Sequence, residues 1–461
     1  MDFPFFSLNY PGIAVITDDG RSIRYDELKR LAGEWAANVP ARSLVFLLVG
    51  NNVDSLVAYV ACLNHGIVPL MLDAHIDMQL LQRFVDIYQP DFIWHPIDGG
   101  YVLEPQNTSN PRKELHPELA LLLTTSGSTG SPKLVRQSYT NIKANTASIV
   151  EYLGLDATER PITTLPMNYT YGLSIINSHL AVGATILLTE KSIMQREFWN
   201  FFTEQGATSF GGVPYTYEML DKLMFFRRKL PSLRTLTQAG GKILPVLHQK
   251  FAEYAKREGK RFVVMYGQCE ATARMAYLPP ECALDKIGSM GIAIPGGKLT
   301  LLDVDNHVIN VPDVTGELVY EGANVTFGYA ECVADLSKGD ERHGRLITGD
   351  MAKRDADGFY YIVGRKKRFL KIFGNRVNLD ETERLIKNHF TGIDCACGGV
   401  DDKMKIYVAC SEQNNHSNEQ ILAIRDFVTD KTHLNFAAIE IVPVNAIPKN
   451  ASGKTLYSEL S

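Results

Sequence analysis

Residues 124–133 read Thr-Thr-Ser-Gly-Ser-Thr-Gly-Ser-Pro-Lys and directly follow an apolar segment, Leu119 to Leu123. The apolar segment predicts a buried strand. The residues after it combine flexible glycines, several hydroxyls and one cation, Lys133, which are groups that wrap a polyphosphate. A polar surface turn is the alternative, because Gly, Ser and Pro mark turns in general. The Pro-Lys pair and the many hydroxyls favour the phosphate loop.

A second segment of this kind, Pro448 to Lys454, reads Pro-Lys-Asn-Ala-Ser-Gly-Lys. Neither segment fits the P-loop pattern, in which Gly and four further residues precede Gly-Lys-Ser/Thr. Pro132 occupies the glycine position next to Lys133, and Pro448 occupies the first glycine position before Lys454. The sequence therefore predicts two phosphate-type loops of another class, far apart in the chain.

Length and composition narrow the class of protein. The chain has 461 residues, a length that suits roughly two to four domains. A net charge of −5 argues against a general nucleic-acid binder. Seven cysteines show no disulfide or metal spacing, which suits a reducing compartment. Without a signal-like start or an apolar run of ~20 residues, we expect a cytoplasmic protein with no membrane span.

The order of predicted elements indicates an α/β protein. Short apolar strands alternate with helical patterns over residues 13–123, and this pattern repeats after the loop, where Thr140 is a plausible N-cap. Short β segments separated by Gly, Asn and Asp turns over 297–364 predict a β-barrel-like subdomain. A small α+β region follows, in which Asn378 caps a helix over 379–389.

Five segments, in order, resemble the AMP-forming adenylating superfamily, which includes acyl-CoA synthetases, adenylation domains of peptide synthetases and luciferases. The resemblance covers essentially the whole chain, and the shared order makes coincidence improbable. It implies a large amino-terminal adenylation domain over 1–365 and a small mobile carboxyl-terminal domain over 368–461, with a hinge at Lys367. The segments are 124–133, Tyr266-Gly267-Gln268-Cys269-Glu270, Thr348-Gly349-Asp350, Gly364-Arg365-Lys366-Lys367 with Lys371 and Gly374, and 448–454.

The resemblance also implies the chemistry. A carboxylate attacks the α-phosphate of ATP, pyrophosphate leaves, and a thiol then takes the acyl group from the acyl-adenylate. ATP and Mg²⁺ are implied, with CoA as the favoured acceptor. The implied phosphate-binding residues are Thr125, Ser126, Gly127, Ser128, Thr129, Gly130 and Lys133.

Further residues receive roles from the same resemblance. Lys454 orients the carboxylate and the α-phosphate, and Thr125 and Glu270 complete the catalytic set. Glu270 is the expected Mg²⁺ ligand, because a hard cation prefers carboxylate oxygen. The remaining nucleotide contacts are implied for Gly240, Gly241, Tyr266 (against adenine), Gly267, Cys269, Asp350 (to the ribose hydroxyls) and Arg365.

Four positions depart from the family pattern: Cys269 replaces a usual Thr, Tyr139 and Tyr169 replace frequent histidines, and Arg368 replaces a common Asp. A thiol is a weak hydrogen-bond donor, so the contact of Cys269 with the α-phosphate should be poorer. A catalytic cysteine of low pKa is the less favoured alternative.

The residues expected around the acyl group narrow the class of acid. Amino-acid-activating members usually carry an Asp near 166–174, and this chain has none there. Tyr169, Tyr171 and Tyr215 could line a pocket for a short polar or aromatic acid. A stand-alone enzyme that loads a carrier-protein phosphopantetheine or acylates an amine stays open, as does a non-catalytic nucleotide-binding protein.

Overall fold

The computed structural model describes residues 4–106, 114–124, 133–373, 375–390, 392–409, 418–432, 434–449 and 455–460. The chain divides into two compact units. The first comprises Met1–Leu299 and Tyr320–Leu346, and the second comprises Thr300–Val319 and Ile347–Ser461. The expected α/β class, with a large amino-terminal part and a smaller carboxyl-terminal part, is confirmed. The hinge at Lys367 concerns a movement and stays a prediction.

The first unit contains a seven-stranded sheet whose central strands are apolar and buried except at their last residues, as expected for strands covered on both faces. Its last hairpin pairs Thr124 with Leu134, so the predicted phosphate loop joins the two strands of that hairpin. In spatial order the strands are β17 (Gly328–Ala330), β8 (Leu134–Ser138), β7 (Leu119–Thr124), β4 (Val68–Asp73), β3 (Leu44–Val49), β5 (Phe92–Ile97) and β6 (Gly100–Pro105).

A second sheet in this unit begins with three parallel strands and ends with two antiparallel ones. Its order is β10 (Ser209–Gly212), β11 (Thr235–Gln238), β12 (Arg261–Tyr266), β13 (Ala276–Tyr277) and β14 (Ile292–Ala293). A small third sheet contains β2 (Ser22–Arg24), β1 (Ile13–Thr17) and β9 (Ile186–Leu188).

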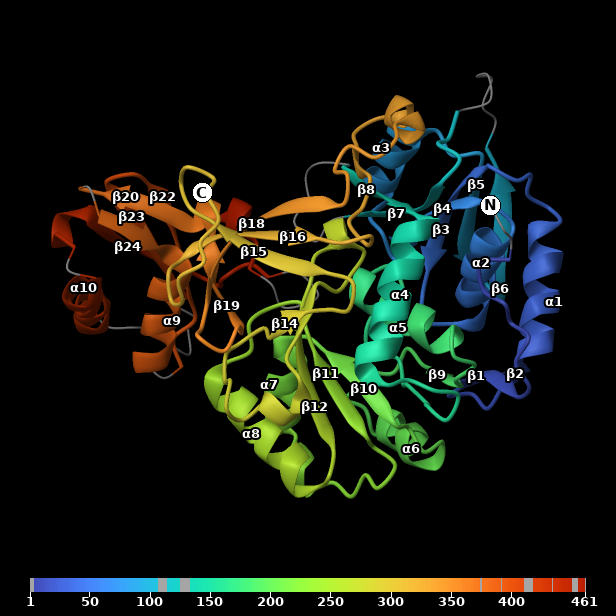
Figure 1. Ribbon diagram of the computed structural model, residues 1–461, viewed down its shortest axis with the longest axis horizontal. Helices are drawn as coiled ribbons and strands as arrows, with labels where there is room; N and C mark the ends of the chain where they lie inside the picture. Colours follow the sequence, from blue (N-terminus) through green and yellow to red (C-terminus); the bar gives the residue numbers. More distant parts are fainter. Residues whose placement is uncertain are drawn as a thin grey trace. The chain divides into compact units, whose positions relative to one another are not determined.

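Helices α4 (Tyr139–Leu153) and α5 (Thr170–Leu180) lie side by side between the two large sheets (Figure 1). One side of this pair packs on β3, β4 and β7, and the other packs on β11 and β12. The other α-helices of the unit are α1 (Tyr25–Ala36), α2 (Val53–Asn64), α3 (Met78–Tyr88), α6 (Arg196–Glu204), α7 (Pro214–Lys222) and α8 (Pro245–Arg257).

The predicted N-cap of α4 is wrong. Ser138, not Thr140, caps the helix: its Oγ accepts the backbone N–H of Asn141 at 3.1 Å, and the Asn141 side chain accepts the N–H of Ser138 at 2.9 Å. This reciprocal capping box satisfies two N–H groups at once, whereas a helix that began after Thr140 would lack it.

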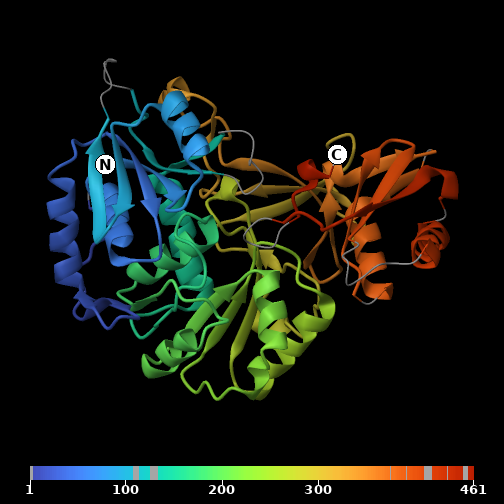
Figure 2. The ribbon, with the colours of Figure 1, turned by 180° about the vertical axis from the view of Figure 1, so that it is seen from behind.

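The second unit contains most of a four-stranded sheet and the carboxyl-terminal α+β region. The predicted helix over 379–389 is confirmed as α9 (Leu379–His389), with Asn378 accepting the N–H groups of Asp380 and Glu381. Helices α9 and α10 (Asn418–Thr432) pack on the sheet of β22, β23 and β24 (Figure 2). The strands are β15 (Lys298–Leu302), β16 (Gly316–Glu321), β18 (Arg345–Arg354), β19 (Tyr360–Arg365), β20 (Phe369–Ile372), β21 (Asn375–Asn378), β22 (Cys395–Val400), β23 (Lys403–Ala409) and β24 (Ile439–Val444).

Short 3₁₀ helices connect several elements: η1 (Phe225–Arg227), η2 (Cys269–Ala271), η3 (Pro280–Cys282), η4 (Val333–Ser337), η5 (Lys366–Arg368), η6 (Phe436–Ala438) and η7 (Tyr457–Glu459). Among the described residues, none of the helices is long and apolar enough to cross a lipid bilayer.

Candidate nucleotide and acyl site

The carboxyl ends of β11 and β12 gather two of the predicted motifs. The strands are parallel, with Gln238 opposite Val264. Gly240 and Gly241 therefore leave β11 at the level where Tyr266 ends β12. In open α/β sheets this edge is where ligands bind, so the topology explains why motifs distant in sequence meet there.

Gly240 cannot be replaced by a larger residue without strain. Its φ is +84°, a conformation that favours glycine, and an ideal Cβ would lie 2.6 Å from the hydroxyl oxygen of Tyr169. Gly241 lies beside Pro214, whose Cγ would be 3.1 Å from an added Cβ. The glycine pair thus brings the chain close to Tyr169, one of the residues predicted for the acyl pocket.

The turn after β12 is tight because Gly267 packs against its own returning chain. A Cβ on Gly267 would lie 1.6 Å from the carbonyl oxygen of Ala273. The N–H of Met275 donates to the carbonyl of Tyr266 at 2.9 Å, which closes the turn. Helix η2 follows at once, so this closure fixes the backbone that carries Glu270.

Glu270 is held by both its backbone and its side chain. Its carbonyl oxygen accepts the N–H and the hydroxyl of Thr326, each at 3.0 Å, and Nη1 of Arg342 at 3.2 Å. Its carboxylate Oε1 accepts the hydroxyl of Tyr329 at 2.7 Å. No cation among the described residues forms an ion pair with this carboxylate. A fixed, unpaired carboxylate suits the oxygen preference of Mg²⁺, so Glu270 fits its predicted role.

Both ends of the predicted phosphate loop lie at this turn. The Sγ of Cys269 is 3.9 Å from the carbonyl oxygen of Thr124. At the other end, Nζ of Lys133 lies 3.8 Å from the ring centroid of Tyr329, the residue that binds Glu270. The loop residues themselves lie outside the described part of the chain: Thr125, Ser126, Gly127, Ser128, Thr129 and Gly130.

Cys269 has the properties of a structural thiol. Burial, with a further contribution from the charge of Glu270, raises the pKa of Cys269 above its ordinary value. The thiol therefore stays protonated near neutral pH, and the thiolate is the reactive form. The environment of Cys269 disfavours a catalytic cysteine of low pKa.

We expect Cys269 to resist alkylation near neutral pH. With limiting iodoacetamide, peptide mass spectrometry should show label on the exposed Cys332 and none on Cys269. Cys332 serves as the internal control for reagent activity. Labelling of both thiols at similar rates would show that Cys269 is an activated nucleophile.

The three predicted acyl-pocket tyrosines differ in environment. Tyr169 is half-buried, and its ring lies 6.3 Å from that of Tyr171. Tyr171 is buried, and its hydroxyl donates to the carbonyl of Thr237 at 2.8 Å. Burial raises the pKa of Tyr171 to about 12. Tyr215 is exposed at the start of α7. Tyr169 alone directs its hydroxyl toward the backbone of Gly240.

A buried cation, Arg274, lies against the ring of Tyr171. It is 2% exposed, and its guanidinium lies 4.2 Å from the ring centroid of Tyr171. Its Nη2 donates to Oγ of Ser174 at 3.1 Å, and Nη1 lies 3.4 Å from the hydroxyl of Tyr152. No carboxylate among the described residues is within ion-pair distance of Arg274, so its charge makes this side of the site electropositive.

In the second unit, cross-strand pairing brings two predicted residues together. Asp350 on β18 is opposite Arg365 on β19, and Nε of Arg365 lies 3.4 Å from Oδ1 of Asp350. Asp350 is 5% exposed. Lys367 is exposed within η5, and Lys454 lies outside the described residues. The roles of these residues stay predictions.

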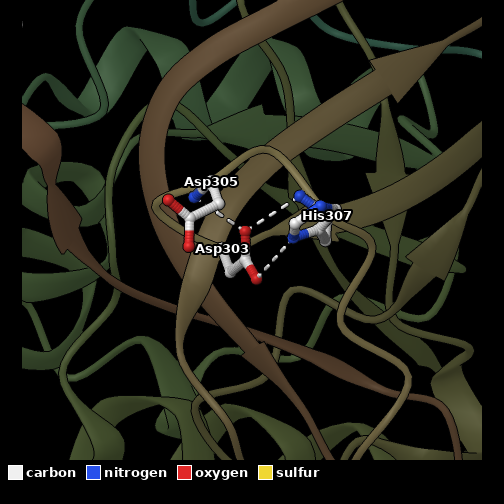
Figure 3. A group of neighbouring side chains, drawn as sticks. All are labelled: Asp303, Asp305 and His307. Carbon is white, nitrogen blue, oxygen red and sulfur yellow. Dashed lines mark hydrogen bonds and ion pairs between the residues drawn. The ribbon is translucent and has the colours of Figure 1, made fainter.

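One cluster of possible metal ligands, Asp303, Asp305 and His307, lies in an exposed turn (Figure 3). Oδ1 of Asp303 accepts the backbone N–H groups of Asp305 and His307, each at 2.8 Å. The hydrogen bond from His307 is the main cause that lowers the pKa of Asp303. An Asp that caps its own turn in this way needs no ion to account for its position.

The sequence did not indicate Tyr329 or Arg342 as site residues. Tyr329 is 59 positions from Glu270 in the chain and reaches it because β17 pairs with β8. Arg342 lies 4.6 Å from the Tyr329 ring centroid. No local spacing in the sequence marks such a contact, and the short strand β17 is not distinguishable from its neighbours by periodicity.

Comparisons with known proteins agree with this geometry. The chain is 23% identical to 2-succinylbenzoate–CoA ligase of Bacillus subtilis over 471 residues, which covers 97% of this chain and 94% of the relative.

Two solved structures share the fold. The ATP-bound MatB of Rhodopseudomonas palustris has a TM-score of 0.80 and 22% identity, covering 99% of this chain and 97% of that one. The o-succinylbenzoate coenzyme A synthetase of Bacillus subtilis, in complex with ATP and a magnesium ion, has a TM-score of 0.78 and 20% identity, covering 97% and 96%.

The sequence profile of the family described as AMP-binding enzyme matches residues 88–330. This match spans the first sheet from β5, the glycine pair, the Glu270 turn and β17, and it confirms the resemblance to the adenylating superfamily. Because the match covers more than half of its length, the chain belongs to the AMP-binding enzyme family.

Proposed function

We propose that this chain is an ATP-dependent, AMP-forming acid–thiol ligase and that its thiol substrate is CoA. One observation carries the proposal furthest. Thr124 and Lys133, the described flanks of the predicted phosphate loop, both lie at the turn that holds Glu270. A loop of hydroxyls and N–H groups that starts and ends beside a fixed carboxylate suits a polyphosphate with its metal ion.

The proposed reaction has two steps. The carboxylate oxygen of the acid attacks the α-phosphorus of ATP, the bond to pyrophosphate breaks, and an acyl-adenylate forms. The sulfur of the thiol then attacks the acyl carbonyl carbon, the bond from that carbon to the bridging oxygen breaks, and AMP leaves with this oxygen while the thiol proton is released. In both steps the protein mainly orients anions and stabilises developing charge.

Each predicted residue keeps its role within this proposal. The loop over 125–132 and Lys133 bind the β- and γ-phosphates, and Tyr266 packs on adenine. Glu270 binds Mg²⁺, which, when bound, would neutralise charge on the phosphate oxygens. Asp350 and Arg365 bind the ribose, and Lys454 orients the two reacting anions.

The surroundings of Tyr169 indicate which class of carboxylic acid the chain would activate. Its hydroxyl faces the Gly240 backbone, and the charge of Arg274 lies beneath the neighbouring Tyr171. A predicted acyl site with a positive charge on one side and one tyrosine hydroxyl suits a short polar or aromatic acid. The name of the Bacillus subtilis relative supports CoA as acceptor. The free cysteines of the described chain suit a cytoplasmic location.

A panel of carboxylic acids tests this function. With ATP and Mg²⁺, one class of acid should release pyrophosphate, and hydroxylamine should trap its acyl group as a hydroxamate. Adding CoA should then yield AMP and an acyl-CoA thioester. If a carrier protein is acylated while CoA is not, the proposal that CoA is the acceptor is wrong. If no acid releases pyrophosphate, the enzyme assignment fails.

A further inference from the structure

Tyr329 contacts two charged groups that belong to different predicted motifs. Its hydroxyl donates to Oε1 of Glu270 at 2.7 Å. Its ring centroid lies 3.8 Å from Nζ of Lys133, at the end of the phosphate loop, and 4.6 Å from the guanidinium carbon of Arg342. One side chain therefore links the carboxylate predicted to bind metal with a cation predicted to bind phosphate.

The strand register explains why these groups meet. β17 pairs antiparallel with β8, with Tyr329 opposite Val135 and Ala330 opposite Leu134. The next step along this ladder brings Glu331 opposite Lys133, and the two form an ion pair at 3.2 Å. Because the ladder places Tyr329 at the amino end of β8, its ring lies under the side chain that leaves the loop.

The backbone of Tyr329 is held as firmly as its side chain. Its carbonyl oxygen accepts Nε of Arg136 at 3.1 Å, and Arg136 is fully buried and forms an ion pair with Glu341 at 2.5 Å. A tyrosine has only two side-chain torsions that move its ring, so a fixed backbone and a ring in contact with two cations leave its hydroxyl little freedom. The hydroxyl can therefore dictate how the Glu270 carboxylate is rotated.

From these contacts we infer that Tyr329 is a positioning residue for Mg·ATP. Its hydroxyl binds one oxygen of Glu270 and so orients the carboxylate that would hold the metal, while its ring contacts the ammonium of Lys133, which would bind the phosphates. The inference rests on the proposed function, since it assumes that this turn binds Mg·ATP. It adds a residue that touches neither substrate nor metal but orders two groups that do.

Measuring the affinity for ATP in the absence of a carboxylic acid tests the role of Tyr329 without any contribution from catalysis. Isothermal titration should be run with Mg·ATP and with ATP in excess EDTA. The variant Tyr329→Phe removes only the hydroxyl, so its dissociation constant for Mg·ATP should rise about tenfold. Its dissociation constant for metal-free ATP should stay within about twofold of the wild-type value, because phenylalanine keeps the ring that Lys133 contacts.

A second variant separates the ring from the hydroxyl. Tyr329→Leu should weaken both forms of ATP, because Lys133 then loses the ring it lies on. Tyr361→Phe is the matched control, since the Tyr361 hydroxyl also binds a carboxylate, Asp355, at 3.2 Å but in the second unit. This control should bind both forms of ATP like the wild type.

The outcomes separate the inference from the function. Wild-type Mg·ATP affinity in Tyr329→Phe, or an equal loss for Mg·ATP and metal-free ATP, overturns the positioning role even if the enzyme is active. A wild type that binds Mg·ATP but activates no acid contradicts the proposed function and leaves the binding comparison valid. A wild type that binds no Mg·ATP overturns both.

Discussion

Replacing Lys454 by alanine is expected to lower the rate of acyl-adenylate formation by about 10²–10³-fold, the loss typical of one charged group at a transition state. The carboxylate and the α-phosphate are both anions, and a cation between them offsets their repulsion as they approach. Thiol transfer from a preformed acyl-adenylate should keep most of its rate, because no second anion must then approach the phosphate.

The described residues that flank the Lys454 segment make contacts of their own. Nζ of Lys449 lies 2.6 Å from Oδ2 of Asp394, and the N–H of Leu456 donates to the carbonyl of Pro448 at 2.9 Å. These contacts do not involve the Lys454 side chain, so the alanine variant should fold normally.

The two half-reactions are measured separately, by pyrophosphate exchange and by thioester formation from synthetic acyl-adenylate. Lys403→Ala is the control, since Lys403 forms a surface pair with Glu440 in the same unit and should affect neither step. An equal loss in both half-reactions would argue against a lysine that serves adenylation alone.

Gly267→Ala is expected to cost about 3 kcal/mol or more of folding free energy and to reduce adenylation by at least about 10²-fold. The added Cβ would lie 1.6 Å from the carbonyl oxygen of Ala273 and 3.0 Å from Cα of Arg274. Both are backbone atoms, so the turn must open. Opening it displaces Glu270, and a displacement of about 1 Å is enough for this loss of rate.

Denaturant unfolding and pyrophosphate exchange check the two parts of this prediction. The matched control is Gly33→Ala in α1, where an added Cβ meets no atom within 4 Å. The free energy of unfolding of that variant should rise by up to about 1 kcal/mol, because alanine favours helix more than glycine does. If Gly267→Ala is as stable and active as the wild type, the tight turn is not what holds Glu270.

Local patterns predicted most of the fold. The apolar run Leu119 to Leu123 forms all but the last residue of strand β7, and the predicted helix over 379–389 is α9. The N-cap of α4 was misplaced by two residues, because Ser138 and Thr140 are both good caps and only the partner Asn141 decides between them.

The site was predictable only where its residues follow one another in the chain. The turn from Tyr266 to Glu270 could be identified, and so could the lysine that ends the loop. The contact of Tyr329 with Glu270 depends on strand pairing, which sequence periodicity does not encode. The bond between the Tyr171 hydroxyl and Thr237 was hidden for the same reason, since it joins α5 to β11.

Strand β17 lies almost 200 residues after β8 in the chain, so the sheet lacks this edge strand during much of synthesis. A ribosome releases β8 long before residues 328–330, so the sheet of the nascent chain has only six of its seven strands and an open edge at Leu134 to Ser138. Open edges of apolar strands pair with other chains. Arg136, at the centre of that edge, carries a charge that neither β17 nor Glu341 has yet covered. We expect this arginine to protect the growing polypeptide from aggregation before it becomes a buried part of the folded enzyme.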